Sequence, residues 1–182
     1  LTVEETGRRA RYDFLQRTAA AVGAERIATA HHRDDLAETV LLQLLRGTGP
    51  QGLTGIPPAR GNIVRPLLDT PRRDIERYIE ENGLAYVTDE TNSDLAYARN
   101  RLRLEIWPEL ERINPSASAH IARTADILRR ESAYLDELAA GYLPETGTAV
   151  SCEVLLTAPE ALRPRLLRLL LDRLGTGKKD VT

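Results

Sequence analysis

The sequence is poor in the residues from which several protein classes are built. Its 182 residues include one cysteine, Cys152, and no methionine. A lone cysteine excludes an intrachain disulfide framework, and it excludes any CxxC or iron–sulfur centre made by this chain alone. It therefore favours a reducing, cytoplasmic setting. No run approaches 18 apolar residues and no signal-peptide pattern opens the chain, so we expect neither a membrane span nor export.

The chain also lacks an excess of charge of either sign. Its 25 Lys and Arg residues nearly balance its 27 Asp and Glu residues, which gives a formal net charge of −2. Any nucleic-acid surface must therefore come from local clustering of basic residues. Methionine is missing even at position 1, and the segment from Thr2 to Glu5 is typical of a capping box that opens a helix at once. We therefore expect sequence to be missing on both sides.

What the chain does contain is a dense polar segment from His31 to Thr39. The segment follows a short apolar run and precedes a strongly apolar stretch with helical spacing. A strand that delivers polar residues at its carboxyl end and then enters a helix is the usual way in which an open α/β sheet builds a site. Asp34, Asp35 and Glu38 fall within about the first turn of the expected helix, with Asp35 and Glu38 on one face.

These carboxylates favour two interpretations. Asp34 or its neighbour is expected to cap the helix, because acidic groups are stabilised at its positive end. A cap needs only one acidic group, however, and three carboxylates beside His31 repel one another. A cation or a cationic ligand is therefore the natural counterpart. One histidine with three carboxylates and no thiolate suits a hard cation better than structural zinc.

The remaining sequence predicts an α/β fold that becomes mostly helical in its second part. Short runs at 26–30 and 62–65 are typical of strands, and further strands are expected at 85–87 and 149–156. Thr70 followed by Pro71 is typical of a helix start, with threonine as N-cap. Pro108 is expected to end a helix. The expected helices cover residues 4–22, 34–46, 70–82, 95–106, 116–140 and 159–174.

Glycine and proline are concentrated between Gly47 and Pro58. Such a segment is either a linker or a loop whose backbone approaches phosphate. No GKS or GKT sequence ends it, so it is not a Walker A loop.

The basic residues leave their roles open. Arg99 and Arg103, beside Asn100, either fork onto phosphates or a carboxylate or form a solvated face paired with nearby acids such as Glu105. Arg11 on the first helix either reaches the strand-end site or stays at the surface. A second basic region is either a surface stripe or an RNA contact. It consists of Arg163, Arg165, Arg168, Arg173, Lys178 and Lys179.

An ordered series of motifs resembles one enzyme family. The series is His31-x-x-Asp34-Asp35-x-x-Glu38-Thr39, Arg46-Gly47-Thr48-Gly49, Gly52-Leu53, Arg65-Pro66-Leu67-Leu68, Asp89-Glu90-Thr91-Asn92 and Arg99-Asn100-x-x-Arg103. Over about residues 4–115 it resembles the bacterial tRNA(Ile)-lysidine synthases of the PP-loop ATP-pyrophosphatase superfamily. The resemblance implies the C-terminal part of a Rossmann-like parallel-sheet domain (1–112), a connector helix (113–141) and the start of a tRNA-binding domain (142–182). The family's Ser-Gly-Gly-x-Asp-Ser phosphate loop does not occur in this sequence and is expected upstream of Leu1.

The resemblance implies a two-step ligase. ATP activates the C2 carbonyl oxygen of the wobble cytidine in the isoleucine tRNA with a CAU anticodon. The ε-amine of lysine then attacks C2, which gives lysidine and AMP and changes the codon from AUG to AUA. Asp35 and Glu38 are the expected ammonium ligands, and Arg103 the expected stabiliser of negative charge. The expected binders of ATP or other substrates are His31, Asp34, Arg11, Arg99 and Asn100, with Asp34 also a candidate ligand of Mg²⁺.

Two alternatives stay open. One is a PP-loop thiolase that installs sulfur on a tRNA base, although many such enzymes use paired cysteines and this chain has one. The other is a non-catalytic RNA-binding module, which the basic clusters permit but which leaves the acidic segment unexplained. For the ligase, tRNA(Ile) and free lysine are the expected partners, and a homodimer is one expected state of assembly.

Overall fold

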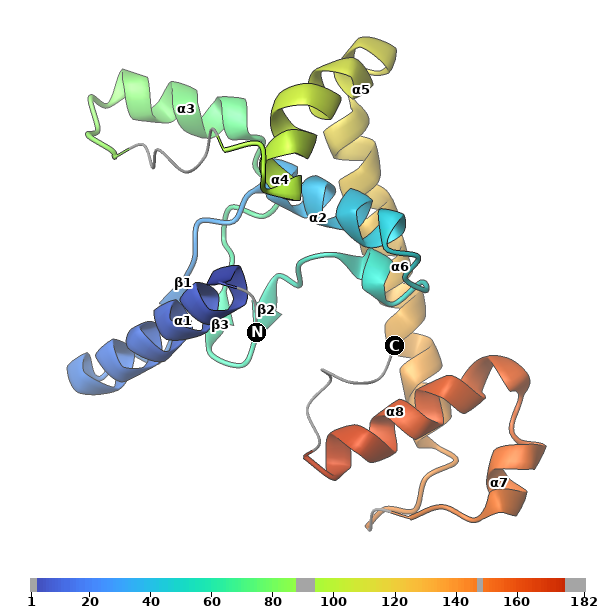
Figure 1. Ribbon diagram of the computed structural model, residues 1–182. Coiled ribbons are helices and arrows are strands. Elements are labelled where there is room, and N and C mark those ends of the chain that lie inside the picture. The colour runs from blue at the N-terminus through green and yellow to red at the C-terminus, as the bar shows by residue number, and fades with distance from the viewer. Residues whose placement is uncertain (1–2, 88–93, 147–148, 176–182) are drawn as a thin grey trace. The chain divides into compact units, whose positions relative to one another are not determined.

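The computed structural model describes residues 3–87, 94–146 and 149–175, with side chains from Thr6 onward (Figure 1). The chain divides into two compact units, Leu1–Ala125 and Asp126–Thr182. The border between them lies within helix α6 (Ala117–Ala140). The long helix predicted over 116–140 is therefore confirmed. Its role as a connector, and the domain boundaries near residues 112 and 141, stay predictions.

The first unit contains a three-stranded sheet. Strand β1 (Ile27–Ala28) pairs in parallel with β3 (Ile63–Val64), and β3 pairs antiparallel with β2 (Ala59–Arg60). Helix α1 (Val3–Val22) precedes β1, and helix α2 (Arg33–Leu45) lies between the two parallel strands in the chain. This β–α–β order confirms the predicted α/β fold and both expected strands, and it brings the carboxyl ends of β1 and β3 to one edge.

The glycine-rich loop packs against α2. Leu36 and Val40 of α2 are buried in a cluster with Leu68, and Leu53 and Ile56 of the loop pack against that cluster. Gly55 follows the short 3₁₀ helix η1 (Gly52–Thr54) with a φ of +63°, and a Cβ there would collide with Leu36 and Val40. The segment is therefore a packed part of this unit.

Helix α3 (Arg72–Glu81) begins differently from the prediction. Pro71, in extended backbone, is its N-cap, and no side chain of its own segment caps it. Asp34 supplies that bond, since its Oδ2 accepts a hydrogen bond of 2.7 Å from the backbone N–H of Arg72. The expectation of Thr70 as the cap is wrong because the capping side chain comes from 38 residues away. The strand expected at 85–87 is also wrong, since these residues are exposed and lie outside the sheet.

A single helical run carries the arginine motif. It consists of α4 (Ala98–Arg101), the π-helical turn η3 (Leu102–Ile106) and α5 (Trp107–Ile113). Pro108 does not end this run, contrary to the prediction. The N–H of Trp107 bonds to the carbonyl of Leu102, five residues back, and Pro108 falls in the first turn of α5. A proline at that position removes only an N–H that a helix start leaves free.

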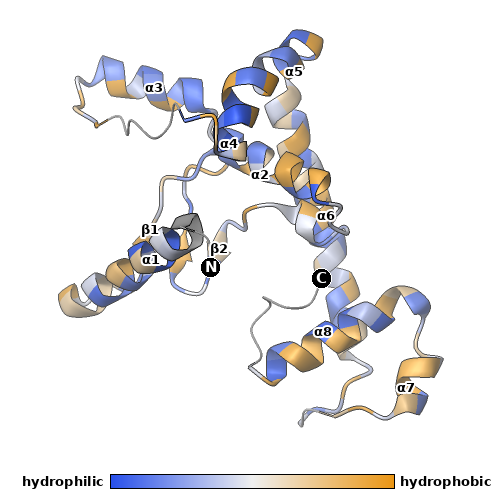
Figure 2. Ribbon diagram, in the orientation of Figure 1, coloured by the Kyte–Doolittle hydropathy of each residue, from blue (hydrophilic) through white to orange (hydrophobic). Residues whose placement is uncertain are grey.

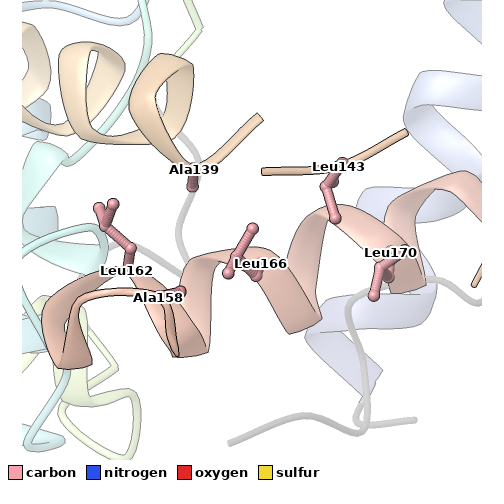
Figure 3. Close-up of a cluster of buried hydrophobic side chains, with 6 residues drawn as sticks. All are labelled: Ala139, Leu143, Ala158, Leu162, Leu166 and Leu170. Carbon is pink, nitrogen blue, oxygen red and sulfur yellow. The ribbon is translucent and has the colours of Figure 1, made fainter. Parts of the chain in front are cut away.

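The second unit has its own core, which Figure 3 shows. It is formed by the C-terminal part of α6, helix α7 (Cys152–Thr157), the 3₁₀ helix η4 (Glu160–Leu162) and helix α8 (Arg163–Arg173). Leu162, Leu166 and Leu170 are buried there, as their spacing predicts. The strand expected at 149–156 is wrong. The Oγ of Ser151 accepts a hydrogen bond from the N–H of Val154 and caps α7, so this segment becomes a helix.

The arginines of α8 are engaged within the second unit. Arg165 is 9% exposed and bonds the carbonyl and Oγ of Ser132, and both Arg165 and Arg168 lie 2.6 Å from Asp136. Arg163 donates to the carbonyls of Leu156 and Ala158, while Arg173 donates to that of Pro144. These four residues therefore connect α8 to other segments of the unit. Lys178 and Lys179 lie outside the described residues.

Hydropathy differs from helix to helix, as Figure 2 shows, with α3 largely hydrophilic and α8 mixed. In the parts of the chain that the structure describes, no helix has both the length and the apolar character needed to cross a membrane.

Candidate functional site

The polar segment forms the start of α2 through a capping box. The backbone N–H of His32 donates to Asp35 Oδ2 at 3.0 Å, and the N–H of Asp35 donates to His32 Nδ1 at 3.3 Å. His32 is therefore the N-cap, and the helix begins at Arg33. Asp34 does not cap α2, which corrects the expectation for this residue. Its carboxylate serves α3 instead, so the segment organises two helix starts.

Two carboxylates of α2 meet two guanidinium groups of the α4–η3 run, and we call these residues the Asp35–Glu38–Arg99–Arg103 cluster. Arg99 Nε lies 2.8 Å from Glu38 Oε2. Arg103 donates from Nε to Glu38 Oε1 at 2.7 Å and from Nη2 to Glu38 Oε2 at 2.9 Å. Asp35 Oδ1 accepts from both arginines, at 3.3 and 3.1 Å. The sequence motifs at 31–39 and 99–103 are thus partners in space.

The cluster pairs two negative with two positive side chains, and each of them is at most one third exposed to solvent. The side chain of Glu38 is 3% exposed, that of Asp35 15%, and those of Arg99 and Arg103 33% and 25%. Burial by itself lowers the pKa of Arg103, but the hydrogen bond and charge of Glu38, together with Asp35, outweigh burial and raise this pKa above its ordinary range. The chain itself thus supplies two cations to these carboxylates, through the carboxylate fork that is one of the expected roles of the arginines. The expected role of Asp35 and Glu38 towards an ammonium group stays a prediction.

His31 lies just after β1, where its Nδ1 is 3.0 Å from Thr29 Oγ1. Burial lowers the pKa of His31, and the positive charges of Arg65, Arg8 and Arg99 lower it further, while Asp35 opposes them. The net effect of burial and of these charges favours the neutral form of the imidazole. Arg65, which follows β3, is 7% exposed and donates to the carbonyl of Pro57 at 2.7 Å. This buried cation beside His31 was not among the expected site residues, although it stands in the Arg-Pro-Leu-Leu motif.

Asn100 and Arg11, two further expected residues, are placed as follows. Asn100 donates to the carbonyl of Asp94 at 2.9 Å and so bonds its own segment. Arg11 is exposed on α1. The Asp89-Glu90-Thr91-Asn92 motif lies outside the described residues.

A cleft of about 570 Å³ adjoins the cluster within the first unit. Clefts of this size accommodate small molecules or parts of larger ones. Glu38, Arg103 and Asp34 were expected at a site, whereas the remaining lining was not. Trp107, four residues after Arg103 on the helical run, could have been found from that spacing. The lining consists of Arg33, Asp34, Glu38, Pro71, Arg72, Arg73, Glu76, Arg103, Trp107, Glu111, Pro115, Ser116, Ser118 and Ala119.

Asp34 is the expected ligand of Mg²⁺. Across residues 3–87, 94–146 and 149–175, no group of three or more His, Cys, Asp or Glu side chains gathers around one point that could hold a metal. Asp34 Oδ2 already accepts the N–H of Arg72. The residues described here therefore do not by themselves form a site that fits Mg²⁺.

Comparison with known proteins identifies relatives over the whole chain. The model of the PP-loop domain family matches residues 1–110. The chain is 45% identical to a tRNA(Ile)-lysidine synthase of Geobacter sulfurreducens, covering 92% of this chain and 38% of that protein. It is 42% identical to those of Symbiobacterium thermophilum and Chromobacterium violaceum, covering 100% and 96% of this chain and 42% and 41% of theirs. The predicted resemblance is confirmed, and the chain spans about two fifths of the length of these relatives.

Among solved structures, the chain is similar to the U34-tRNA thiolase NcsA from Methanococcus maripaludis, described with its 4Fe-4S cluster. The TM-score is 0.56 at 18% identity, and the match covers 71% of this chain and 45% of the thiolase. At this identity the similarity concerns the fold, and it agrees with the predicted Rossmann-like architecture.

Proposed function

Because this chain belongs to the PP-loop domain family, we propose that it forms part of an ATP-dependent tRNA(Ile)-lysidine synthase. The observation that carries the proposal is the 42–45% identity to curated synthases over nearly the whole chain. The proposed product is lysidine at the wobble position of tRNA(Ile) with a CAU anticodon, which changes the codon read from AUG to AUA.

The proposed reaction has two steps. First, the C2 carbonyl oxygen of the cytidine attacks the α-phosphorus of ATP, the bond to pyrophosphate breaks, and the tRNA becomes adenylated. Second, the ε-amine of lysine attacks C2, the C2–O bond breaks, AMP leaves, and the amine loses a proton. The second step needs a group that first binds lysine through its ammonium form and then accepts a proton, because only the neutral amine can attack C2.

We assign the lysine amine to Asp35. Its carboxylate is more exposed than that of Glu38, and it sits where two helical segments meet. A carboxylate both attracts the ammonium group and accepts its proton. Arg103, the second assigned catalytic residue, stabilises negative charge on the adenylate as AMP leaves. Glu38 belongs to the same proposed set of catalytic residues. It receives hydrogen bonds from both arginines, and we infer that it fixes their guanidinium planes.

ATP is proposed to approach the edge of the sheet where β1 and β3 end. Burial lowers the pKa of His31, and in its neutral form this imidazole can exchange hydrogen bonds there without adding charge. Arg11, Arg99, Asn100 and Asp34 complete the proposed set of binding residues. A magnesium ion on the phosphates of ATP stays part of the proposal, and its ligands must then include groups beyond Asp34.

The proposed partners are tRNA(Ile) and free L-lysine, and a homodimer and a cytoplasmic location belong to the same proposal. The location rests on the single cysteine of the chain.

The test uses the intact protein that carries this chain. We expect lysine- and tRNA-dependent release of AMP and pyrophosphate from ATP, with lysidine in the recovered tRNA(Ile). Asp35→Asn should lower lysidine formation by about 100-fold or more, because it removes the proton acceptor. Asparagine keeps an oxygen that can accept the cap hydrogen bond from the N–H of His32, but it removes a charge that faces Arg99 and Arg103. Circular dichroism and thermal unfolding therefore verify that the variant is folded at the assay temperature. Near-normal turnover of Asp35→Asn would contradict the assignment.

The same assay separates the alternatives. A thiolase would consume ATP with a sulfur donor and leave lysine unused, whereas a binding module would retain tRNA without releasing pyrophosphate. The only cysteine of this sequence, Cys152, is exposed on α7 in the second unit, and no contact described for it favours the thiolase.

A further inference from the structure

The cleft beside the cluster contains cationic and polar groups that the cluster does not use. We propose that it binds a phosphate group through Arg33 and Ser118, and that this phosphate belongs to the RNA backbone. The choice of RNA as the source rests on the proposed function. The phosphate site itself rests on the contacts within the cleft.

The carboxylates that line the cleft are already engaged. Asp34 accepts the N–H of Arg72, and Glu38 accepts from Arg99 and Arg103. Glu76 lies 2.7 Å from Arg72 Nε, and Glu111 accepts from Trp107 Nε1 at 3.1 Å. The acidic groups of the lining are therefore committed to partners within the first unit.

Arg33 and Ser118 differ from these carboxylates because each has a polar side-chain atom that lacks a partner among the described residues. In the described part of the chain, Arg33 Nε and Ser118 Oγ are buried atoms without a hydrogen-bond partner, and no ion pair involves Arg33. Ser118 is 6% exposed and lines the cleft together with Arg33. Buried polar groups in proteins are nearly always satisfied, so a guanidinium and a hydroxyl left open at one cleft indicate a ligand that accepts hydrogen bonds.

Three helices begin at this cleft. Arg33 is the first residue of α2, Arg72 and Arg73 are the first two of α3, and Ser118 is the second of α6. The N-terminal end of a helix carries partial positive charge and disfavours a cation. Asp34 already places one carboxylate between the starts of α2 and α3, and Arg72 and Arg73 lie beside Glu76 and Asp74. The cation at these helix starts that is left without such a partner among the described residues is Arg33, and an anion bound in the cleft would balance it. Guanidinium groups, hydroxyls and helix N-termini are the groups by which proteins hold backbone phosphates.

The test measures binding rather than turnover. The intact protein, Arg33→Gln, Arg33→Lys and Ser118→Ala are titrated with tRNA(Ile) at several salt concentrations, and separately with inorganic pyrophosphate. Arg77→Gln is the matched control, because Arg77 lies on α3 outside the cleft lining and pairs with Asp74 and Glu81. Thermal unfolding verifies that each variant is folded.

We expect Arg33→Gln to weaken tRNA binding about 5- to 10-fold and to make the slope of log K against log salt shallower by about 0.7–0.9, the value for one lost phosphate contact. Arg33→Lys should restore most of the slope, Ser118→Ala should weaken binding about threefold, and Arg77→Gln should bind like the parent. If pyrophosphate binding falls while tRNA binding is unchanged, the RNA assignment is overturned and the phosphate belongs to a nucleotide. If neither ligand distinguishes the cleft variants from Arg77→Gln, the site does not exist.

These outcomes are separable from the proposed function. A parent protein that makes no lysidine, but whose Arg33→Gln variant loses tRNA affinity, supports the cleft and refutes the synthase. A parent that makes lysidine, and whose cleft variants bind tRNA normally, supports the synthase and refutes the phosphate site in the cleft.

Discussion

Arg103 donates two hydrogen bonds to Glu38, from Nε to Oε1 at 2.7 Å and from Nη2 to Oε2 at 2.9 Å, although the two residues are 65 positions apart in the sequence. A bidentate guanidinium–carboxylate pair fixes orientation as well as charge. Arg99 adds a further bond of 2.8 Å to the same carboxylate. Glu38, together with Asp35, therefore attaches the α4–η3 run to α2.

Glu38→Gln should destabilise the protein strongly. It removes the buried negative charge while two guanidinium groups remain beside it, and breaking such a pair costs about 3–5 kcal/mol. We expect the lower end, since Arg99 and Arg103 are 33% and 25% exposed and water screens part of the loss. Urea unfolding measures this change. Glu105→Gln is the matched control, because the exposed Arg101–Glu105 pair on the same run should contribute less than about 1 kcal/mol. Equal effects of the two substitutions would contradict the assigned role of Glu38.

Gly55→Ala should destabilise the first unit by about 2–4 kcal/mol, from the left-handed backbone and from overpacking. The added methyl group would collide with Leu36 and Val40. Gly61→Ala isolates the backbone effect, because Gly61 has a φ of +61° but open space around its Cβ position. That control should lose only about 1 kcal/mol. Chemical denaturation compares the two, and a similar loss for both would mean that the loop does not pack on α2.

His31 should make stability depend on pH below neutrality. Its pKa is lowered in the folded state, so the unfolded chain takes up a proton first as the pH falls below about 6.5. The contribution of His31 is therefore present above that pH and is lost as the pH falls towards the folded pKa. In His31→Gln, the free energy of unfolding should decline less steeply between pH 7 and 5, by at most about 1.4 kcal/mol per pH unit. Identical slopes in parent and variant would show that folding does not lower the pKa of His31.

Leu166→Ala should weaken the second unit by about 2–5 kcal/mol, because Leu166 is 0% exposed at the centre of the core shown in Figure 3. The neighbouring Leu167 is 49% exposed. Leu167→Ala is therefore expected to change the stability by less than about 1 kcal/mol. Guanidinium unfolding followed by circular dichroism distinguishes them, and a larger effect at Leu167 would show that α8 packs through another face.

The sequence predicts the elements that depend on periodicity. Helices α1, α2, α6 and α8 and the strands β1 and β3 lie where their patterns place them. The same pattern indicated that the acidic groups of α2 need a cation. It did not single out Arg99 and Arg103 as neighbours of these groups, because the partners are 61 to 68 residues apart and local spacing carries no information on such separations.

The incorrect expectations share a physical cause. Thr70 was expected as a cap from its own dipeptide, whereas Asp34 supplies the bond from another helix. Pro108 was expected to break a helix, yet the π-helical turn before it accommodates the ring. Residues 149–156 have an apolar pattern typical of a strand, but the cap at Ser151 starts a helix. In each case the structure depends on a hydrogen bond that apolar periodicity does not indicate, whether it spans 38 residues, as at Asp34, or only three, as at Ser151.

The π-helical turn at Leu102–Ile106 also determines how α5 is rotated about the helix axis relative to α4. Each residue of an α-helix advances the chain by about 100° around the axis, so one residue more or less in this turn would rotate α5 against α4 by about that angle. Arg99 would then remain in register with α2 while Trp107 turned away from the cleft that it now lines. The length of this stretch, more than the identity of its exposed side chains, is what keeps the two ends of the helical run facing the same site.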